Sequence, residues 1–320
     1  MYEIYQTIAG KLTQLEPEYI SQEDIWCHMV APTAEEIDTI VSQTGIPRDF
    51  LQNPLDINER PRIERENGYT LVIIHTPAWN SPEESESEES GYIQYTTVPL
   101  GMVITPKALF TVSSKPNDVL QDFFEGKVRN FSTKKRSRLM LQILYRTASK
   151  FLNYLQVITQ ISNEIETSLH KSMRNEELIG LLNIEKSLVY FSTSIRANEL
   201  VLERLHRYGE LTKFEEDKDF LEDLIVENKQ ALEMTNIHTN ILSSTMDAFA
   251  SVISNNLSRV MKFLTSVTII LMIPTLVASI YGMNIALPFQ HSPHAFTITM
   301  GISIGCALVG VLIFIKRKWF

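Results

Sequence analysis

The sequence lacks charged side chains over one long stretch near its C-terminus. No Asp, Glu, Lys or Arg occurs from Phe263 to Ile315, and the histidines of this stretch are His291 and His294. Two apolar runs fill most of it, at about 263–280 and 295–315. Each run is about long enough to cross a ~30 Å hydrocarbon core as a helix. The sequence therefore predicts a membrane hairpin with a short connecting loop.

Other absences exclude whole classes of protein. The two cysteines, Cys27 and Cys306, suggest neither a disulfide framework nor a metal cluster and are interpreted as packing residues. The net charge of −9 has its acidic excess ahead of the apolar runs, which disfavours a nucleic-acid partner. The first ten residues lack the basic start and apolar core of a signal peptide. Phosphate loops, nucleophile elbows and paired catalytic acids are missing, so we expect neither an enzyme, nor an ATP-driven pump, nor an organic cofactor.

The few basic residues around the apolar runs predict a topology. Arg259 and Lys262 precede the first run, Lys316, Arg317 and Lys318 follow the second, and the connecting loop has no Lys or Arg. Because basic residues stay on the cytoplasmic side, both ends are expected in the cytoplasm and the loop outside. We therefore expect a multi-pass protein of the cell membrane with a large cytosolic N-terminal part.

Residues 1–130 are predicted to form a cytosolic α/β domain, in which helices pack on a mixed sheet. Strands are expected at about 25–30, 69–74, 96–104 and 108–112, and Asn67-Gly68 is the strongest hairpin signal. Thr33 and Glu36 have capping-box spacing, which predicts a helix that ends near Gly45.

An acidic segment interrupts this domain. Residues 81–90 comprise five Glu, four Ser and one Pro, a composition that cannot bury itself. We interpret the segment as a solvated loop, with attraction of cations as the alternative.

Long helices are predicted next. Apolar residues recur every three or four positions over 131–212, which indicates an antiparallel helical pair, and again over a stalk helix at 213–262. Between Lys213 and Pro274 there is neither Pro nor Gly. One helix reaching to Gly282 would be roughly 100 Å long. A monomer of this size could not bury such a rod, so we expect an oligomer.

The end of this helix carries a stripe of apolar and hydroxyl side chains, spaced by three or four residues. The stripe comprises Met261, Leu264, Thr268, Met272, Thr275 and Ser279, and Asn284 terminates it. The pattern fits the lining of a pore. It also fits an ordinary packed helix interface, where small and hydroxyl residues are common.

Four segments together resemble the CorA family of magnesium transporters. They are NNLSRVMK at 255–262, PTLVAS at 274–279, YGMN at 281–284 and the tail KRKWF at 316–320. The resemblance is clearest over residues 220–320. It implies a funnel-shaped homopentamer in which the stalk continues into a pore-lining span at 263–284, followed by an external loop at 285–294, a second span at 295–315 and a basic tail at 316–320.

The resemblance implies Mg²⁺ as the transported ion and Gly282, Met283 and Asn284 as the selectivity motif. Mg²⁺ gives up its water reluctantly, so a ring of Asn284 amide oxygens suits a hydrated ion. Gly282 would let the helix end and the backbone turn there. Met272, Leu264 and Met261 would form apolar constrictions that block ions by dewetting, with Thr275 as a polar step between them. Pro274 is expected either to kink the span or to be a tolerated membrane proline.

The resemblance also implies closure when cytosolic Mg²⁺ binds carboxylates between neighbouring subunits. Asp223 and Asp247 match acidic positions of the family's stalk, although both could be solvated helix carboxylates. At an N-terminal position where the family tends to have Leu-Glu-Asp, this chain has Leu51-Gln52-Asn53, and the loss of two charges either weakens the site or moves it to Asp56. We therefore expect closure by Mg²⁺ to be shallower here.

The external loop and the basic tail leave alternatives open. The loop has no carboxylate, and His291 and His294 are either polar linkers or ligands for a transition metal such as Zn²⁺ or Ni²⁺. Lys316, Arg317 and Lys318 either ring the pore or anchor the helix to lipid headgroups. The competing functions are a zinc or cobalt/nickel transporter of the same family and a membrane-anchored oligomeric sensor.

Overall fold

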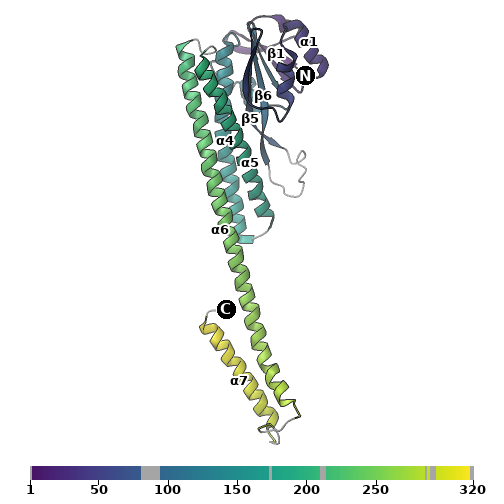
Figure 1. Cartoon of the computed structure of the whole chain (residues 1–320), viewed down its shortest axis with the longest axis vertical. Helices are drawn as coiled ribbons and strands as arrows, with labels where there is room; N and C mark the ends of the chain where they lie inside the picture. The colour runs from purple at the N-terminus through teal and green to yellow at the C-terminus, as the bar shows by residue number, and fades with distance from the viewer. Residues whose placement is uncertain are drawn as a thin grey trace. The chain divides into compact units, whose positions relative to one another are not determined.

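The computed structural model describes residues 2–80, 94–172, 175–209, 214–284, 287–288 and 293–317. The chain divides into two compact units, Met1–Ser244 and Thr245–Phe320. Helix α6 (Glu215–Tyr281) begins in the first unit and ends in the second (Figure 1). The acidic segment 81–90 lies outside the described residues.

The first unit contains a seven-stranded mixed sheet with the order β2-β1-β3-β7-β6-β5-β4. Only the β3–β7 pair is parallel among the described strands. The strands are β1 (Tyr2–Ile8), β2 (Lys11–Leu15), β3 (Ile25–Val30), β4 (Arg62–Glu66), β5 (Tyr69–Asn80), β6 (Gln94–Ile104) and β7 (Ala108–Ser113).

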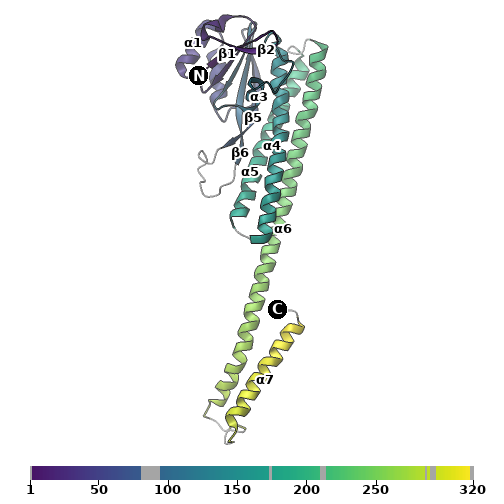
Figure 2. The same cartoon turned by 180° about the vertical axis from the view of Figure 1, so that it is seen from behind.

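Both faces of this sheet are covered, because successive side chains of a strand point to opposite faces. On β5, Leu71 and Ile73 belong to a core with α1 (Ala34–Thr44) and α2 (Arg48–Gln52). Val72 and Ile74 belong to a second core with α3 (Asp118–Phe124), α4 (Arg136–Ser172), α5 (Asn175–Tyr208) and the start of α6. In both views, α4, α5 and this part of α6 run side by side (Figures 1 and 2).

The local predictions for this unit are confirmed. Thr33 and Glu36 form the capping box of α1, and Gly45 ends that helix in the left-handed conformation. Asn67 and Gly68 have positive φ angles of 51° and 84° in the β4–β5 turn. The antiparallel pair is α4 and α5. Strands β1 and β2 and the short helices α2 and α3 were not predicted.

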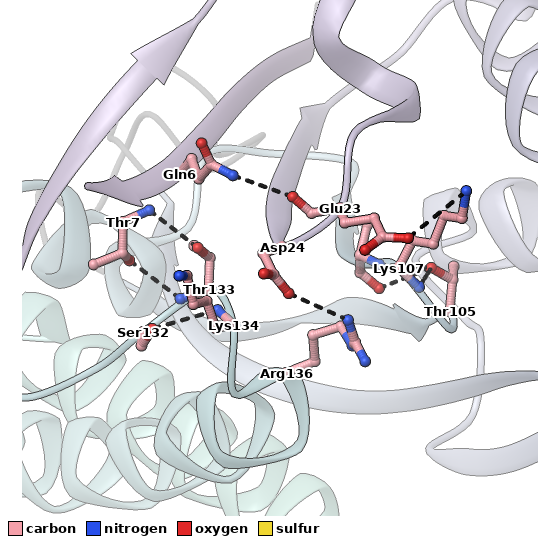
Figure 3. Close-up of polar contacts among 11 residues, drawn as sticks. Gln6, Thr7, Glu23, Asp24, Thr105, Lys107, Ser132, Thr133, Lys134 and Arg136 are labelled. Carbon is pink, nitrogen blue, oxygen red and sulfur yellow. Dashed lines mark hydrogen bonds and ion pairs between the residues drawn. The ribbon is translucent and has the colours of Figure 1, made fainter. Parts of the chain in front are cut away.

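Residues 133–138, around the start of α4, tie this helix to the sheet and to α6. Thr7 and Thr133 exchange backbone-to-hydroxyl hydrogen bonds of 3.0 and 3.1 Å (Figure 3). In the same view, Arg136 lies 3.6 Å from Asp24. Two residues further on, Arg138 bonds to Asp217 of α6 at 3.1 Å.

A buried carboxylate joins α3 to α4. The Asp122 side chain is 2% exposed, and it accepts from Arg146 Nε at 2.7 Å and pairs with Lys150 Nζ at 3.1 Å. Burial opposes ionisation, but the hydrogen bonds from the two bases outweigh it and hold the pKa of Asp122 below its ordinary value.

The second unit contains the end of α6 and helix α7 (Ala295–Lys316). Both helices are long and apolar enough to cross a membrane, with mean hydropathies of 2.2 and 2.5 over their most apolar windows. These are the two apolar helices that the sequence predicts. The boundary predicted at residue 263 between stalk and span stays a prediction, since α6 is continuous across it.

Candidate functional site

The Gly282-Met283-Asn284 triplet directly follows the last residue of α6. Gly282 N donates to Ala278 O at 2.9 Å, and Met283 N donates to Ile280 O at 3.2 Å, so the helical hydrogen bonding ends within the triplet. Gly282 is not among the glycines with positive φ, so it ends the helix without the left-handed turn typical of a glycine cap. Met283 and Asn284 are exposed.

The stripe on α6 is exposed along its whole length within the chain. Met261, Leu264 and Met272 are 52%, 56% and 63% exposed, and the three hydroxyl residues of the stripe are exposed as well. Thr268 Oγ1 donates to Leu264 O at 2.8 Å, and Thr275 Oγ1 donates to Leu271 O at 3.2 Å. Because the hydroxyl protons of Thr268 and Thr275 are used within the helix, the lone pairs of these two oxygens remain as acceptors on the stripe.

The opposite face of α6 packs on α7. Ile270 lies nine positions from both Met261 and Ser279, which places it about 180° around the helix from them. A Cβ added at Gly310 of α7 would lie 3.3 Å from Ile273 Cδ1 and 4.0 Å from Ile270 Cγ1, so glycine permits the close approach of the two helices. Ser266, on the same face as these isoleucines, is fully buried. Sequence reasoning identified the stripe but missed this packed face, which Gly310 and the facing isoleucines could have indicated.

Pro274 lies inside α6, between the stripe residues Met272 and Thr275. It has no backbone N–H, so the carbonyl of Ile270 loses its usual partner four residues on. The helix nevertheless continues to Tyr281, so the proline is accommodated within it.

The three candidate regulatory carboxylates are each exposed. Asp223 and Asp247 lie on α6, and Asp56 lies in the turn that follows the 3₁₀ helix Asn53–Leu55. Asp56 Oδ1 accepts from Asn58 N at 2.9 Å. Within the described residues, no group of three or more His, Cys, Asp or Glu could hold a metal ion. One chain therefore does not bring these carboxylates together, and a cation bound to any of them would need water or ligands from elsewhere.

The predicted basic ring and external histidines are only partly described. Lys316 is the last residue of α7, and Arg317 is its C-cap, with its N–H bonded to Ile313 O at 3.0 Å. Lys318 and His291 lie outside the described residues. His294 is the N-cap residue of α7, and its carbonyl accepts from Ile298 N at 3.0 Å.

In the second unit, α6 has two different faces, and the exposed side chain of Asn284 follows shortly after its end. One face is packed on α7, and the other carries thioether, aliphatic and hydroxyl groups without an ionisable side chain. Such a face can line a passage for a hydrated cation, because hydroxyl oxygens accept water hydrogens and apolar rings restrict wetting.

Comparison with known proteins identifies relatives over nearly the whole chain. The model of the family described as "CorA-like Mg2+ transporter protein" matches residues 21–317. The "Cobalt/magnesium transport protein CorA" of Methanocaldococcus jannaschii is 27% identical, over 97% of this chain and 96% of the relative.

Solved structures are also similar to this chain. The complete structure of the CorA magnesium transporter from M. jannaschii matches with a TM-score of 0.82 and 28% identity, and covers 100% of this chain and 99% of its own. The ZntB cytoplasmic domain from Vibrio parahaemolyticus has a TM-score of 0.62 at 14% identity, with 79% of this chain and 98% of its own covered, and this likeness shows the fold alone.

Proposed function

The chain belongs to the family of CorA-like Mg²⁺ transporters, and from that premise we propose that it conducts Mg²⁺ through a pore lined by the α6 stripe. Membership of the family makes it a membrane transporter of divalent cations and not an enzyme. The choice of Mg²⁺, the selectivity at Gly282-Met283-Asn284, the gating and the homopentamer are our proposals. So are the cytoplasmic position of both termini and the division into cytosolic domain, stalk, spans, loop and tail.

The observation that carries the proposal is the two-faced character of α6. The face around Ile270 and Ile273 is occupied by α7, whereas the stripe is exposed and lies about 180° away. Five copies that enclose an axis would cover the stripe and turn it into the wall of a pore. This arrangement also gives a role to the hydroxyl groups that stand among the apolar ones on the exposed face.

Asn284 is the proposed selectivity residue because it stands where the stripe ends. An amide oxygen accepts hydrogen bonds from the waters that Mg²⁺ holds, without the deep electrostatic trap of a carboxylate. Transport needs no further energy source than the gradient and the membrane potential. A divalent cation gains about 4–5 kcal/mol per 100 mV on entering a negative interior.

Closure by cytosolic Mg²⁺ is proposed to use Asp223, Asp247 and Asp56. Each is exposed, so a neighbouring subunit can supply the second carboxylate or the ordered water that Mg²⁺ requires. With Gln52 and Asn53 at the positions where carboxylates are expected, closure should need more Mg²⁺ than in a fully acidic site.

The test is metal uptake into proteoliposomes by the wild type and by Asn284→Ala. We expect Mg²⁺ flux in the wild type and its loss in the variant, because the amide ring is removed. Asn255→Ala is the matched control, since Asn255 is an exposed asparagine of α6 outside the stripe. Unchanged flux in Asn284→Ala would contradict the proposed mouth. No flux of any metal from an intact oligomer would favour the anchored sensor.

A second candidate function is transport of Co²⁺. It is favoured by the relative whose name joins cobalt and magnesium. Uptake of Co²⁺, Ni²⁺ and Zn²⁺ measured alongside Mg²⁺ separates the two. Flux of Zn²⁺ without Mg²⁺ would keep the pore, change the substrate and direct attention to His291 and His294.

A further inference from the structure

A chain of hydrogen bonds starts at His75, on the part of β5 that extends beyond its pairing with β4. The ring atom Nδ1 lies 3.0 Å from Ser194 Oγ of α5, and Nε2 lies 2.8 Å from the carbonyl oxygen of Glu59. Ser194 Oγ also lies 2.7 Å from Thr97 Oγ1 of β6. His75 is half-buried and Ser194 is 2% exposed, so these bonds are shielded from water.

The chemistry of these groups fixes the direction of each bond. A carbonyl oxygen only accepts, so Nε2 of His75 carries the proton and donates to Glu59 O. Nδ1 is then the acceptor for the Ser194 hydroxyl, and the Ser194 oxygen accepts from Thr97. The neutral ring therefore has one tautomer and one orientation, and it links α5 to the backbone of Glu59.

Asn198 provides a second attachment of α5 to His75, through the His75 backbone. Its Nδ2 donates to His75 O at 2.7 Å, and its Oδ1 accepts from His75 N at 2.8 Å. The pairing of β4 with β5 begins at Arg62 and Ile73, so this edge of β5 is free at His75. Asn198 takes the place of a neighbouring strand there.

At one end, these hydrogen bonds reach the turn that contains Asp56. Glu59 N donates to Asp56 O at 3.0 Å, and Asn58 N donates to Asp56 Oδ1 at 2.9 Å. The carboxylate of Asp56 is exposed at the tip of this short turn. The carbonyl of Glu59 is held by His75, so the ring helps to set where that carboxylate stands.

At the other end, α5 is hydrogen-bonded to α6. Asn228 Nδ2 of α6 donates to Ile195 O of α5 at 3.2 Å, next to Ser194. Asn228 is 3% exposed and Asn198 is 4% exposed. A buried amide without partners is unfavourable, so these contacts are retained only if α5 keeps its place against both neighbours.

We propose that these hydrogen bonds couple the Asp56 turn to α6: His75, Ser194 and Asn198 join the Glu59 backbone to α5, and Asn228 joins α5 to α6 through the carbonyl of Ile195. His75, Ser194 and Asn228 are then positioning residues for closure by cytosolic Mg²⁺. A cation that moves the Asp56 turn displaces the Glu59 carbonyl, and α5 transmits the displacement to the helix that carries the stripe. This inference rests on the proposed function of Asp56. Contiguity alone does not establish coupling, so the test measures an interaction between sites.

The experiment is Mg²⁺ flux in proteoliposomes as a function of Mg²⁺ on the cytosolic side, for the full-length protein. We expect Ser194→Ala and Asn228→Leu to raise the half-closing Mg²⁺ concentration about five- to tenfold, while the flux without cytosolic Mg²⁺ stays the same. Thr235→Val is the matched control. Thr235 is a fully buried residue of α6 whose hydroxyl donates to Ala231 O of its own helix at 2.7 Å. It should shift the concentration less than twofold.

A double-mutant cycle separates coupling from a loss of stability. If the chain acts through Asp56, the half-closing concentration of Asp56→Asn combined with Asn228→Leu is no higher than that of the more affected single variant. Multiplied shifts, or wild-type values in Ser194→Ala and Asn228→Leu, would overturn the inference. Ser194→Ala removes a single oxygen and carries the test should Asn228→Leu not fold.

Failure of the proposed function has a different signature. A wild type that ignores cytosolic Mg²⁺, or an Asp56→Asn variant that closes like the wild type, overturns regulation at Asp56 and the coupling with it. Closure that is lost in Asp56→Asn but normal in Ser194→Ala and Asn228→Leu leaves the regulatory carboxylate in place and overturns the hydrogen-bonded chain alone.

Discussion

Acidification from pH 7 to pH 5 should destabilise the first unit through two histidines, the buried His28 and the half-buried His75. His28 is 7% exposed, its Nδ1 lies 3.1 Å from Thr111 Oγ1, and its ring centroid lies 5.1 Å from that of Phe124. Burial lowers the pKa of His28 to about 4, although the charge of Glu3 acts in the opposite direction. Burial likewise lowers the pKa of His75 to about 4.

The direction of the effect follows from the two pKa values of each ring. In the folded protein both rings stay neutral until the pH approaches about 4, whereas in the unfolded chain they take up protons near 6.5. Between these values the unfolded state binds more protons. The contribution of the two neutral rings to the free energy of unfolding is therefore fully present above pH 6.5 and is lost as the pH falls towards 4. Each histidine should account for about 2 kcal/mol between pH 7 and pH 5, and the pair for about 4 kcal/mol. That is a large part of a typical domain stability of about 5–15 kcal/mol.

The assay is denaturant unfolding of the detergent-solubilised protein at pH 7 and pH 5, followed by near-UV circular dichroism. Trp26 is a suitable reporter, because it is fully buried and its ring centroid lies 6.5 Å from that of His28. His28→Phe and His75→Gln should each remove about half of the loss. His206→Gln, at an exposed position of α5, is the matched control and should leave the loss unchanged.

A double variant that loses as much stability as the wild type between pH 7 and pH 5 would refute the reasoning. A smaller residual loss of the same sign is compatible with it, because burial also lowers the pKa of His238 on α6. Asp122 and Glu36 do not confuse the result, because their pKa values are lowered below the ordinary value of a carboxyl group, which itself lies below pH 5.

Two further changes test the packing of the first unit. Asp122→Asn should lower the free energy of unfolding by about 3 kcal/mol, because it leaves Arg146 and its basic neighbours without the buried charge that they face; a loss below 1 kcal/mol by the same unfolding assay would contradict this. Gly101→Ala should cost about 1–3 kcal/mol, because its Cβ would lie 2.2 Å from Pro54 Cγ. Gly305→Ala, where no heavy atom lies within 4 Å of the added Cβ, is the control and should be neutral.

The elements that could be predicted from the sequence have local signals that tertiary contacts did not override. Thr33 with Glu36 and Asn67 with Gly68 determine helix and turn geometry by themselves. The β1–β2 hairpin was missed because its two-residue turn is Ala9-Gly10, and Ala9 has a φ of 49°, a conformation that alanine rarely adopts. No turn signature marks it. The short helix α3 was missed because its signal is little more than the Asn117 cap.

The candidate site likewise has one part that the sequence predicts and another that it does not. Spacing along one helix was enough to identify the stripe, since Met261, Thr268 and Ser279 share a face whatever surrounds it. It was not enough for the regulatory carboxylates, because Asp56 and Asp223 are far apart in sequence and each stands exposed in the single chain. A ligand set completed by another subunit leaves no pattern of spacing within one sequence.

The hydrogen-bonded chain on α5 was missed for a different reason, and its sequence does contain a signal. Ser187, Ser194 and Asn198 are buried, and they lie seven and four positions apart on the face that also buries Phe191 and Ile195. A search for apolar periodicity passes over such positions, because polar residues there look like interruptions of the pattern. Polar residues at core spacing in a long helix instead predict specific partners, since burying them without hydrogen bonds is unfavourable. Here those partners are the backbone and side chains of β5 and β6, so the polar positions determine which part of the sheet α5 can occupy.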